Sequence, residues 1–131
     1  MIVVARLFRL LSDETRLRIF MLLAHRELCV CQIMGVLGVS QPLVSRNLSL
    51  LSSAGLLRER REGKLIFYGL KKKPVPAVSR MLTLLKAELK GDKRIEEDLR
   101  SLSDCHEFQK KTGKCDMKTF LAFMKKGRER R

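Results

Sequence analysis

Apolar residues recur at helical spacing through the first part of the chain. Positions 3, 4, 7, 8, 10 and 11 are apolar, which predicts a helix over residues 3–11 with a broad buried face. Ser12 is suited to the N-cap of a second helix over residues 12–25, because Asp13 and Glu14 follow it and complement the helix dipole. Two amphipathic helices are therefore expected to open the fold.

Two further helices are predicted close together. Residues 27–37 form a short helix that ends at Gly38, and Ser40 caps a helix that continues through residue 54 and stops at Gly55. Pro42 is tolerated in its first turn, where backbone N–H groups have no intrahelical partner. Two helices joined by a turn of about three residues are typical of a helix-turn-helix.

After Gly55 the pattern changes to two short strands. Residues 56–61 and 64–70 are separated by Glu62-Gly63, a dipeptide that favours a hairpin. The second segment is rich in the β-branched and aromatic residues that strands favour. The expected fold class is mainly α (α+β): a winged helix-turn-helix in which α-helices flank a two-stranded β-hairpin wing.

A fifth helix, over residues 75–90, has one strongly apolar face that needs a partner, either its own domain or another subunit. Gly91 and Asp92 then mark a boundary. Residues 1–91 are predicted to form the DNA-binding and dimerisation domain, and residues 92–131 a C-terminal helical extension. Within the extension we expect a short helix capped by Asp92, a polar loop over residues 103–114 and a helix over residues 116–126.

The charge of the chain favours a polyanionic partner. The net charge is +14, of which residues 1–91 carry +10. Such an excess supports nucleic-acid binding through phosphate contacts. A membrane surface ranks second, because no basic amphipathic helix with a Trp-bearing apolar face is present, and the longest apolar run, residues 19–24, is too short to cross a bilayer.

The N-terminal residues do not resemble a signal peptide, because Arg6 and Arg9 interrupt the apolar stretch. A cytoplasmic, reducing location is therefore expected, in which the four cysteines are thiols and not a disulfide framework. The sequence contains no paired acid–base residues, nucleotide-binding loop or catalytic triad, so the chain is not expected to be an enzyme.

The predicted DNA-contact residues come from the fourth helix and the hairpin. Polar side chains on the helix face opposite Val44, Leu48 and Leu51 can read base edges in the major groove. Four cations crowd the hairpin tip, where they can contact phosphates or the minor groove. The alternative is a merely solvated helix face and charge run. The full set is Ser40, Gln41, Pro42, Ser45, Arg46, Asn47 and Ser49 of the helix, with Arg58, Arg60, Arg61 and Lys64 of the hairpin.

Cys29 and Cys31 stand at the start of the third predicted helix. On a regular helix, side chains at i and i+2 lie about 200° apart, so both thiolates reach one small ion only if the helix start is extended or deformed. We therefore expect a bound ion to strain or unwind this start, next to the recognition helix. A helix N-terminus also lowers the pKa of a cysteine, which prepares thiolates for soft ions. The alternative is that both are small buried hydrophobic residues.

The other two cysteines, Cys105 and Cys115, lie in the segment expected to be a polar loop. Core packing explains cysteines poorly there, so we interpret them as ligands or redox residues. His106 is interpreted as a surface residue.

Several motifs in the right order resemble the ArsR/SmtB family of metalloregulatory repressors, over about residues 5–90. Residues 11–19 (LSDETRLRI) are similar to the family's second-helix signature, residues 27–31 (ELCVC) to its metal box and residues 40–48 (SQPLVSRNL) to its recognition helix. Residues 54–57 (AGLL) and 62–68 (EGKLIFY) look like its wing. The resemblance implies a homodimer that binds double-stranded operator DNA and releases it when metal binds.

The ELCVC form resembles the branch of the family that responds to arsenite and antimonite through a pyramidal three-sulfur site. Two residues depart from the family pattern: Met34 stands where that branch often has a third cysteine, and Asn47 where the family usually has histidine. The leading hypothesis is As(III) or Sb(III) on Cys29, Cys31 and either Cys105 or Cys115, from either subunit. A Zn(II) or Cd(II) site using all four cysteines and a thiol-redox repressor are the alternatives.

Overall fold

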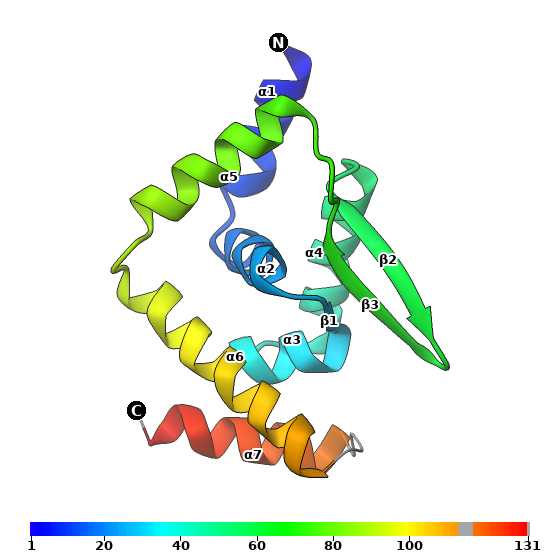
Figure 1. Cartoon of the computed structure of the whole chain (residues 1–131), viewed down its shortest axis with the longest axis vertical. Coiled ribbons are helices and arrows are strands. Elements are labelled where there is room, and N and C mark those ends of the chain that lie inside the picture. Colours follow the sequence, from blue (N-terminus) through cyan, green and yellow to red (C-terminus); the bar gives the residue numbers. More distant parts are fainter. Residues whose placement is uncertain (113–116, 131) are drawn as a thin grey trace.

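The computed structural model describes residues 1–112 and 117–130, with the backbone alone at residues 111 and 112. Helices predominate in this part of the chain (Figure 1). The elements in order are α1 (Ile2–Leu11), α2 (Glu14–His25), β1 (Leu28–Cys29), α3 (Val30–Leu37), α4 (Gln41–Ser53), β2 (Leu57–Glu62), β3 (Leu65–Leu70), α5 (Pro76–Glu88), α6 (Lys93–Thr112) and α7 (Met117–Glu129). The predicted winged helix-turn-helix is confirmed.

The wing has one strand more than predicted. β2 and β3 pair antiparallel from Leu57 opposite Leu70 to Glu62 opposite Leu65, as a hairpin. The short strand β1 adds to the other edge of β3, with Leu28 opposite Tyr68, so that the strand order is β1-β3-β2. Extended backbone therefore replaces the predicted first turn of the third helix.

Two other helix boundaries differ from the prediction. α2 is capped by Asp13, whose carboxylate accepts a hydrogen bond from the N–H of Arg16 at 2.9 Å, whereas Ser12 donates its hydroxyl hydrogen to the carbonyl of Arg9 at 2.7 Å. The loop predicted from residue 103 is wrong as far as Thr112, because α6 continues through it. Cys105 and Phe108 extend the buried stripe of this helix at intervals of three residues, which the polar residues between them mask in the sequence.

The core forms where α2, α3 and α4 pack together beneath the sheet. Ile19 and Leu22 of α2, Ile33 of α3, and Leu48 and Leu51 of α4 are almost completely buried. A rigid, closely packed junction of this kind holds α4 in a fixed orientation relative to the wing.

The extension folds back onto α3 (Figure 1). α7 places the buried side chains of Phe120 and Met124 against Gly35 of α3. α6 is tied to α2 by a bidentate ion pair in which Arg18 donates to Asp98 at 2.8 and 2.9 Å. The proposed division at residues 91 and 92 falls between α5 and α6, and the two-domain division itself stays a prediction. Neither α6 nor any other helix in the described residues has the length and apolarity to cross a membrane.

Candidate nucleic-acid interface and thiol site

α3 and α4 form the helix-turn-helix. Gly38 ends α3 in the left-handed region at φ +70°, where a residue without a Cβ is favoured, and its N–H donates to the carbonyl of Met34 at 2.8 Å. Ser40 then caps α4, because its hydroxyl oxygen accepts from the N–H of Leu43 at 3.4 Å. The turn and both caps agree with the sequence prediction.

The outward face of α4 carries most of the predicted base-reading side chains. Gln41, Arg46 and Ser49 are exposed and Ser45 is partly exposed. Ser40 and Pro42, at the start of the helix, are exposed as well. Hydrogen-bonding groups on an exposed helix face match the donors and acceptors that base pairs present in the major groove. Their contact with DNA stays a prediction.

Asn47 lies inside the protein, so its predicted place on the DNA-reading face is wrong. Its side chain is 3% exposed, and its Oδ1 accepts a hydrogen bond from Nη1 of Arg16 at 3.1 Å. Arg16 also donates through Nε to the carbonyl of Leu10 at 2.6 Å. One arginine thus ties the end of α1, the start of α2 and the middle of α4 together, and Asn47 positions the recognition helix.

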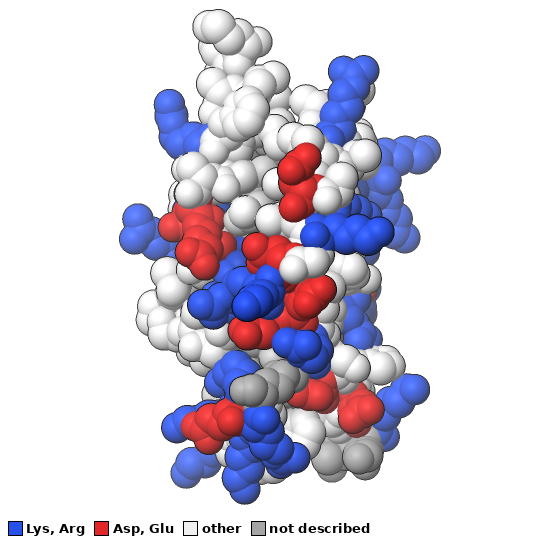
Figure 2. All heavy atoms as spheres, turned by 90° about the vertical axis from the view of Figure 1, so that its left-hand side faces the viewer, with Lys and Arg blue, Asp and Glu red and all other residues white. Residues whose placement is uncertain are grey.

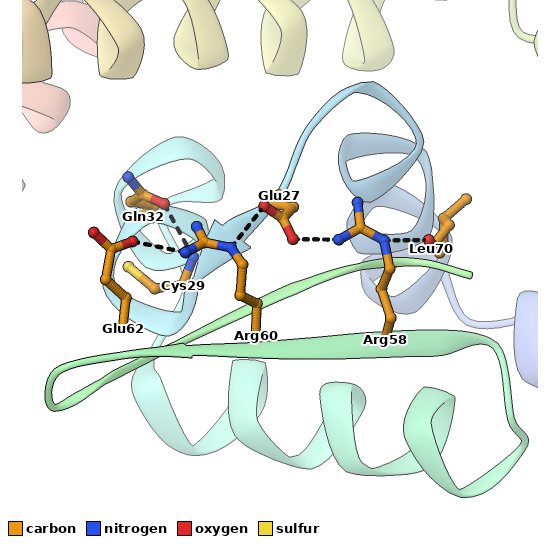
Figure 3. Close-up of polar contacts among 7 residues, drawn as sticks. All are labelled: Glu27, Cys29, Gln32, Arg58, Arg60, Glu62 and Leu70. Atoms are coloured by element: carbon orange, nitrogen blue, oxygen red, sulfur yellow. Dashed lines mark hydrogen bonds and ion pairs between the residues drawn. The ribbon is translucent and has the colours of Figure 1, made fainter. Parts of the chain in front are cut away.

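Two of the four wing cations pair with a carboxylate outside the hairpin (Figure 3). Nη1 of Arg58 forms an ion pair with Glu27, just before β1. Arg60 donates through Nε to the same carboxylate at 3.1 Å and through Nη1 to Glu62 at 2.7 Å, and its guanidinium lies 4.7 Å from the ring centre of Phe67. These two arginines therefore connect strand β2 to the segment that leads into the thiol pair.

The other two wing cations, Arg61 and Lys64, are exposed and form no salt bridge with a described residue. They are the wing side chains that the structure leaves available for phosphate groups. The sequence analysis treated all four cations alike, and the structure separates them.

Cys29 and Cys31 lie side by side, with their Sγ atoms 3.2 Å apart and both side chains buried. They meet because Cys29 is not helical: it ends β1 opposite Phe67 and caps α3 with φ −89° and ψ 170°. The predicted helix start at residue 27 is wrong. The expectation that an ion must unwind this start falls with it, since an extended Cys29 already places both sulfurs on one side.

Gln32 fixes the position of Cys29. The N–H of Cys29 donates to Oε1 of Gln32 at 3.0 Å, and the N–H of Gln32 donates to the Cys29 sulfur in return. This reciprocal arrangement is a capping box with a cysteine in the place of serine or threonine. Gln32 is buried, so the sulfur is held by a rigid element.

A hydrogen bond from the Cys31 thiol is the main influence on the pKa of Cys29, and it lowers it. Burial acts in the opposite direction, and the backbone N–H groups of Gln32 and Cys31 lower the pKa further, so that it reaches about 7. A substantial fraction of Cys29 is therefore thiolate at neutral pH. Thiolates, and not thiols, bind soft ions and attack disulfides.

The structure brings two of the four predicted cysteine ligands together. Cys105 is buried in α6 beside Leu102 and Phe108, so its predicted place in a polar loop is wrong. Cys115 lies outside the described residues. Within residues 1–112 and 117–130, no group of three or more His, Cys, Asp and Glu side chains is placed to hold a metal ion.

Glu27 is the site residue that the sequence analysis missed. Burial raises its pKa, but the hydrogen bonds from Arg60 and Arg58 outweigh burial and hold the pKa below its ordinary value. A signal was present: the two arginines stand at i and i+2 on one strand and so share a face, where they need a counter-charge. Sequence alone does not say which carboxylate faces them.

Comparison with known proteins identifies relatives of part of the chain. The family described as "Bacterial regulatory protein, arsR family" matches residues 13–59. The arsenical resistance operon repressor of Escherichia coli (strain K12) is 50% identical over 66 residues, which cover 50% of this chain and 56% of that protein. The cadmium resistance transcriptional regulatory protein CadC homolog of Staphylococcus aureus is 41% identical over 68 residues, which cover 51% of this chain and 56% of that protein.

Among solved structures, reduced HlyU from Vibrio cholerae N16961 is similar with a TM-score of 0.59 and 30% identity, over 66% of this chain and 87% of that chain. The chain spans about half the length of the curated relatives it matches, and most of this solved one. The similarity therefore covers the winged helix-turn-helix in both sequence and shape.

Proposed function

The chain belongs to the ArsR family of bacterial regulatory proteins, and from this premise we propose that it is a metalloregulatory transcriptional repressor. A homodimer binds operator DNA and leaves it when arsenite or antimonite binds cysteine thiolates. The observation that carries the proposal is the 3.2 Å separation of the Cys29 and Cys31 sulfurs at the base of the wing. The relatives named above are regulators and not enzymes, in agreement with the prediction for this chain.

Two exposed surfaces support DNA binding. α4 presents Gln41, Arg46 and Ser49, and the tip of the hairpin presents Arg61 and Lys64. The helix supplies groups that discriminate bases, whereas the wing supplies cations for the phosphate backbone. The net charge of +14 adds long-range attraction to a polyanion.

Exposed apolar side chains on α1 and α5 support the homodimer. Ile2, Val3 and Phe8 of α1 and Leu84 of α5 are all exposed. An apolar cavity of about 360 Å³ lies between residues of these two helices, and Figure 2 shows an uncharged surface at the α1 end of the molecule. A contiguous apolar patch is typical of a protein–protein interface. A second copy related by a two-fold axis would cover it and present two recognition helices to a palindromic operator.

The sulfur separation favours a pyramidal ion over a tetrahedral one. With metal–sulfur bonds of roughly 2.3 Å, a 3.2 Å separation corresponds to a bond angle of about 90°. Tetrahedral coordination at the same bond length needs sulfurs about 3.8 Å apart. Trivalent arsenic and antimony form pyramidal sites with bond angles close to a right angle. Cys29 and Cys31 therefore suit As(III) or Sb(III) better than Zn(II) or Cd(II).

A third thiolate completes the inorganic site in this proposal, and Cys105 and Cys115 are its candidates, from either subunit. Cys105 is buried in the core, so its use requires α6 to move. Cys115 is a candidate on sequence alone. A cytoplasmic location belongs to the same proposal, because a reducing compartment keeps these thiols free.

Glu27 offers a route from the ion to the DNA. A chelate closed on Cys29 and Cys31 replaces the hydrogen bonds that hold the junction of β1 and α3. Glu27 stands two residues before Cys29 and grips Arg58 and Arg60 of β2 (Figure 3). A shift of the junction thus moves the wing strand, and α3 moves against the adjoining recognition helix.

Thiol oxidation is the second candidate function, and the same geometry favours it. Two sulfurs 3.2 Å apart, with the pKa of Cys29 at about 7, are placed to form a disulfide when an oxidant removes two electrons. An inducer titration separates this function from metalloid sensing.

The test uses the full chain and a fluorescent DNA duplex selected from a random-sequence library by its binding to the chain, called the selected duplex below. Fluorescence anisotropy follows its release by arsenite, antimonite, cadmium, zinc and peroxide, the last with a metal chelator. We expect arsenite and antimonite to release the duplex at the lowest concentrations.

Cys29→Ser and Cys31→Ser should each retain the dimer and the duplex affinity but lose release by arsenite. Unchanged release in both variants would overturn the assignment of the site. Release by peroxide as complete as that by arsenite would replace metalloid sensing with redox sensing.

A further inference from the structure

A groove of about 230 Å³ opens beside the buried sulfurs of the thiol pair. Leu65, Ile66 and Tyr68 of β3 form one wall, and Met34 of α3 and Met117 of α7 contribute to its lining. Leu65 and Met117 are 43% and 47% exposed, so the groove is open to solvent. A ligand can therefore reach the sulfurs without opening the core.

The lining suits an apolar, thiophilic ligand. It contains no aspartate, glutamate or histidine among the described residues, and its polar members are Gln41 and Lys64 at the side of α4 and the hairpin. Oxygen-seeking cations such as Mg²⁺ and Ca²⁺ find no carboxylate here, whereas sulfur ligands select soft ions. Apolar walls beside a soft-ion site have no role in holding a bare ion.

The number of sulfurs limits what can bind. Two thiols converge, and the described residues supply no third ligand of the usual kinds. Inorganic arsenite carries three exchangeable hydroxyl groups, so two thiols leave one of them in place. An arsenic atom with one carbon substituent carries two hydroxyl groups and is saturated by two thiols.

These observations lead beyond the inorganic ion. We propose that the groove binds a trivalent organoarsenical, with its arsenic on Cys29 and Cys31 and its organic substituent against Leu65, Ile66 and Tyr68. The inference rests on the proposed function, since it names the inducer class of the same thiol pair.

The reaction balances without an oxidant or a reductant. R–As(OH)₂ meets two thiols, two As–S bonds form and two As–O bonds break. Each thiol proton leaves with a hydroxyl group, so two water molecules are released, and arsenic stays trivalent. The As–C bond persists throughout, and it directs the substituent away from the two sulfurs.

The space fits an aryl group as well as an alkyl group. An apolar cavity of about 150 Å³ is enough to bind benzene in an engineered protein, and this groove measures about 230 Å³. Burying even part of a phenyl ring removes enough apolar surface from water to strengthen binding by about tenfold. An arylarsenical is therefore expected to bind more tightly than arsenite.

Tyr68 provides a direct readout, because it is the single tyrosine of a chain without tryptophan. Its intrinsic fluorescence reports on the groove itself and does not depend on DNA. The experiment titrates the full reduced chain with phenylarsine oxide, methylarsonous acid and arsenite, and follows both Tyr68 fluorescence and release of the selected duplex.

We expect phenylarsine oxide to bind about tenfold more tightly than arsenite. Ile66→Ser should remove most of this advantage and leave the arsenite affinity unchanged. Phe67→Leu is the matched control: it lies on the same strand with its side chain on the other face, outside the groove lining, and should keep the advantage. Equal affinities for the two arsenicals, or an unaffected advantage in Ile66→Ser, would overturn the proposal.

Ligand count gives a second, independent criterion. Cys115→Ser, alone and with Cys105→Ala, should keep phenylarsine oxide binding because two thiols suffice, whereas Cys29→Ser and Cys31→Ser should abolish it. Loss of binding in the folded single variant Cys115→Ser would overturn the proposal.

The two proposals fail separately. Quenching of Tyr68 by phenylarsine oxide without release of the duplex would support the groove and refute the repressor mechanism. Release by arsenite together with no preference for phenylarsine oxide would refute the groove and leave the repressor mechanism standing.

Discussion

The Glu27 carboxylate and the Arg58 guanidinium form an ion pair that joins the segment before β1 to strand β2 of the wing. The same carboxylate accepts a hydrogen bond from Arg60 at 3.1 Å, so one acidic residue holds two arginines of one strand face. Cys29 follows two residues later. A change at the sulfurs and a change in the wing are thereby joined through a short, charged connection.

Removing the charge of Glu27 should uncouple the thiol pair from the wing. In Glu27→Gln, we expect the affinity for the selected duplex to change by less than about threefold, since the pair is partly exposed. The factor by which arsenite weakens duplex binding should fall by about fivefold, which corresponds to a coupling of about 1 kcal/mol. Anisotropy titrations with and without arsenite measure both quantities.

Glu62→Gln is the matched control, because Glu62 also pairs with Arg60 but lies at the hairpin tip, away from the thiol segment. It should leave the arsenite factor unchanged. An equal loss of coupling in both variants would show that wing charge, and not the connection through Glu27, matters.

Much of the fold could be predicted from the sequence because its signals are local. The caps at Gly38 and Ser40 and the Glu62-Gly63 turn depend on backbone conformations that few residue types favour, and each lies where it was expected. The start of the third helix failed for the opposite reason. Leu28 and Cys29 become extended because β3 offers them a free edge, which is a tertiary effect.

The site was predictable in residue type but less so in arrangement. Cys29 and Cys31 were found from their spacing, yet whether their sulfurs meet depends on one residue's backbone conformation. Asn47 has the composition of a DNA-reading residue, and only its bond to Arg16 reveals that it faces inward. Glu27 carried no motif of its own, since its partners lie more than thirty positions away.

The wing cations should differ in their contribution to DNA binding. Arg61→Ala should lower the slope of log affinity against log salt concentration by about one unit, because one phosphate contact is lost. Arg58→Ala should change this slope less, since Glu27 already offsets its charge. Affinities for the selected duplex at several salt concentrations check the difference, and equal slope changes would contradict the separation of the two arginines.

The thiolate of Cys29 should titrate near neutral pH. In a metal-free variant with Cys105→Ala and Cys115→Ser, ultraviolet thiolate absorbance should show a first step at a pKa of about 7. Adding Cys31→Ala removes the hydrogen-bond donor that stabilises the anion, so the pKa of Cys29 should rise toward the ordinary thiol value of 9.0. A midpoint that stays near 7 without Cys31 would contradict the role given to that hydrogen bond.

Docking of α7 on α3 should depend on the absence of a side chain at Gly35. A Cβ there would lie 2.5 Å from Cε2 of Phe120 and 3.0 Å from Cγ of Met124, both in fully buried side chains. In Gly35→Ala, the gain in helix propensity is about 1 kcal/mol, whereas overpacking a core costs about 1–3 kcal/mol. The cost should prevail, and urea unfolding should show a loss of about 1 kcal/mol in the free energy of unfolding.

The smaller side chain in Phe120→Leu should relieve the clash. That substitution alone should destabilise the chain, because it empties part of a packed site, but in the double variant the two losses should not add. A coupling of about 1 kcal/mol between the two positions is expected from side chains in direct contact. Strictly additive losses would mean that α7 does not rest on Gly35, and the extension would then lose its direct hold on the helix that carries Cys31.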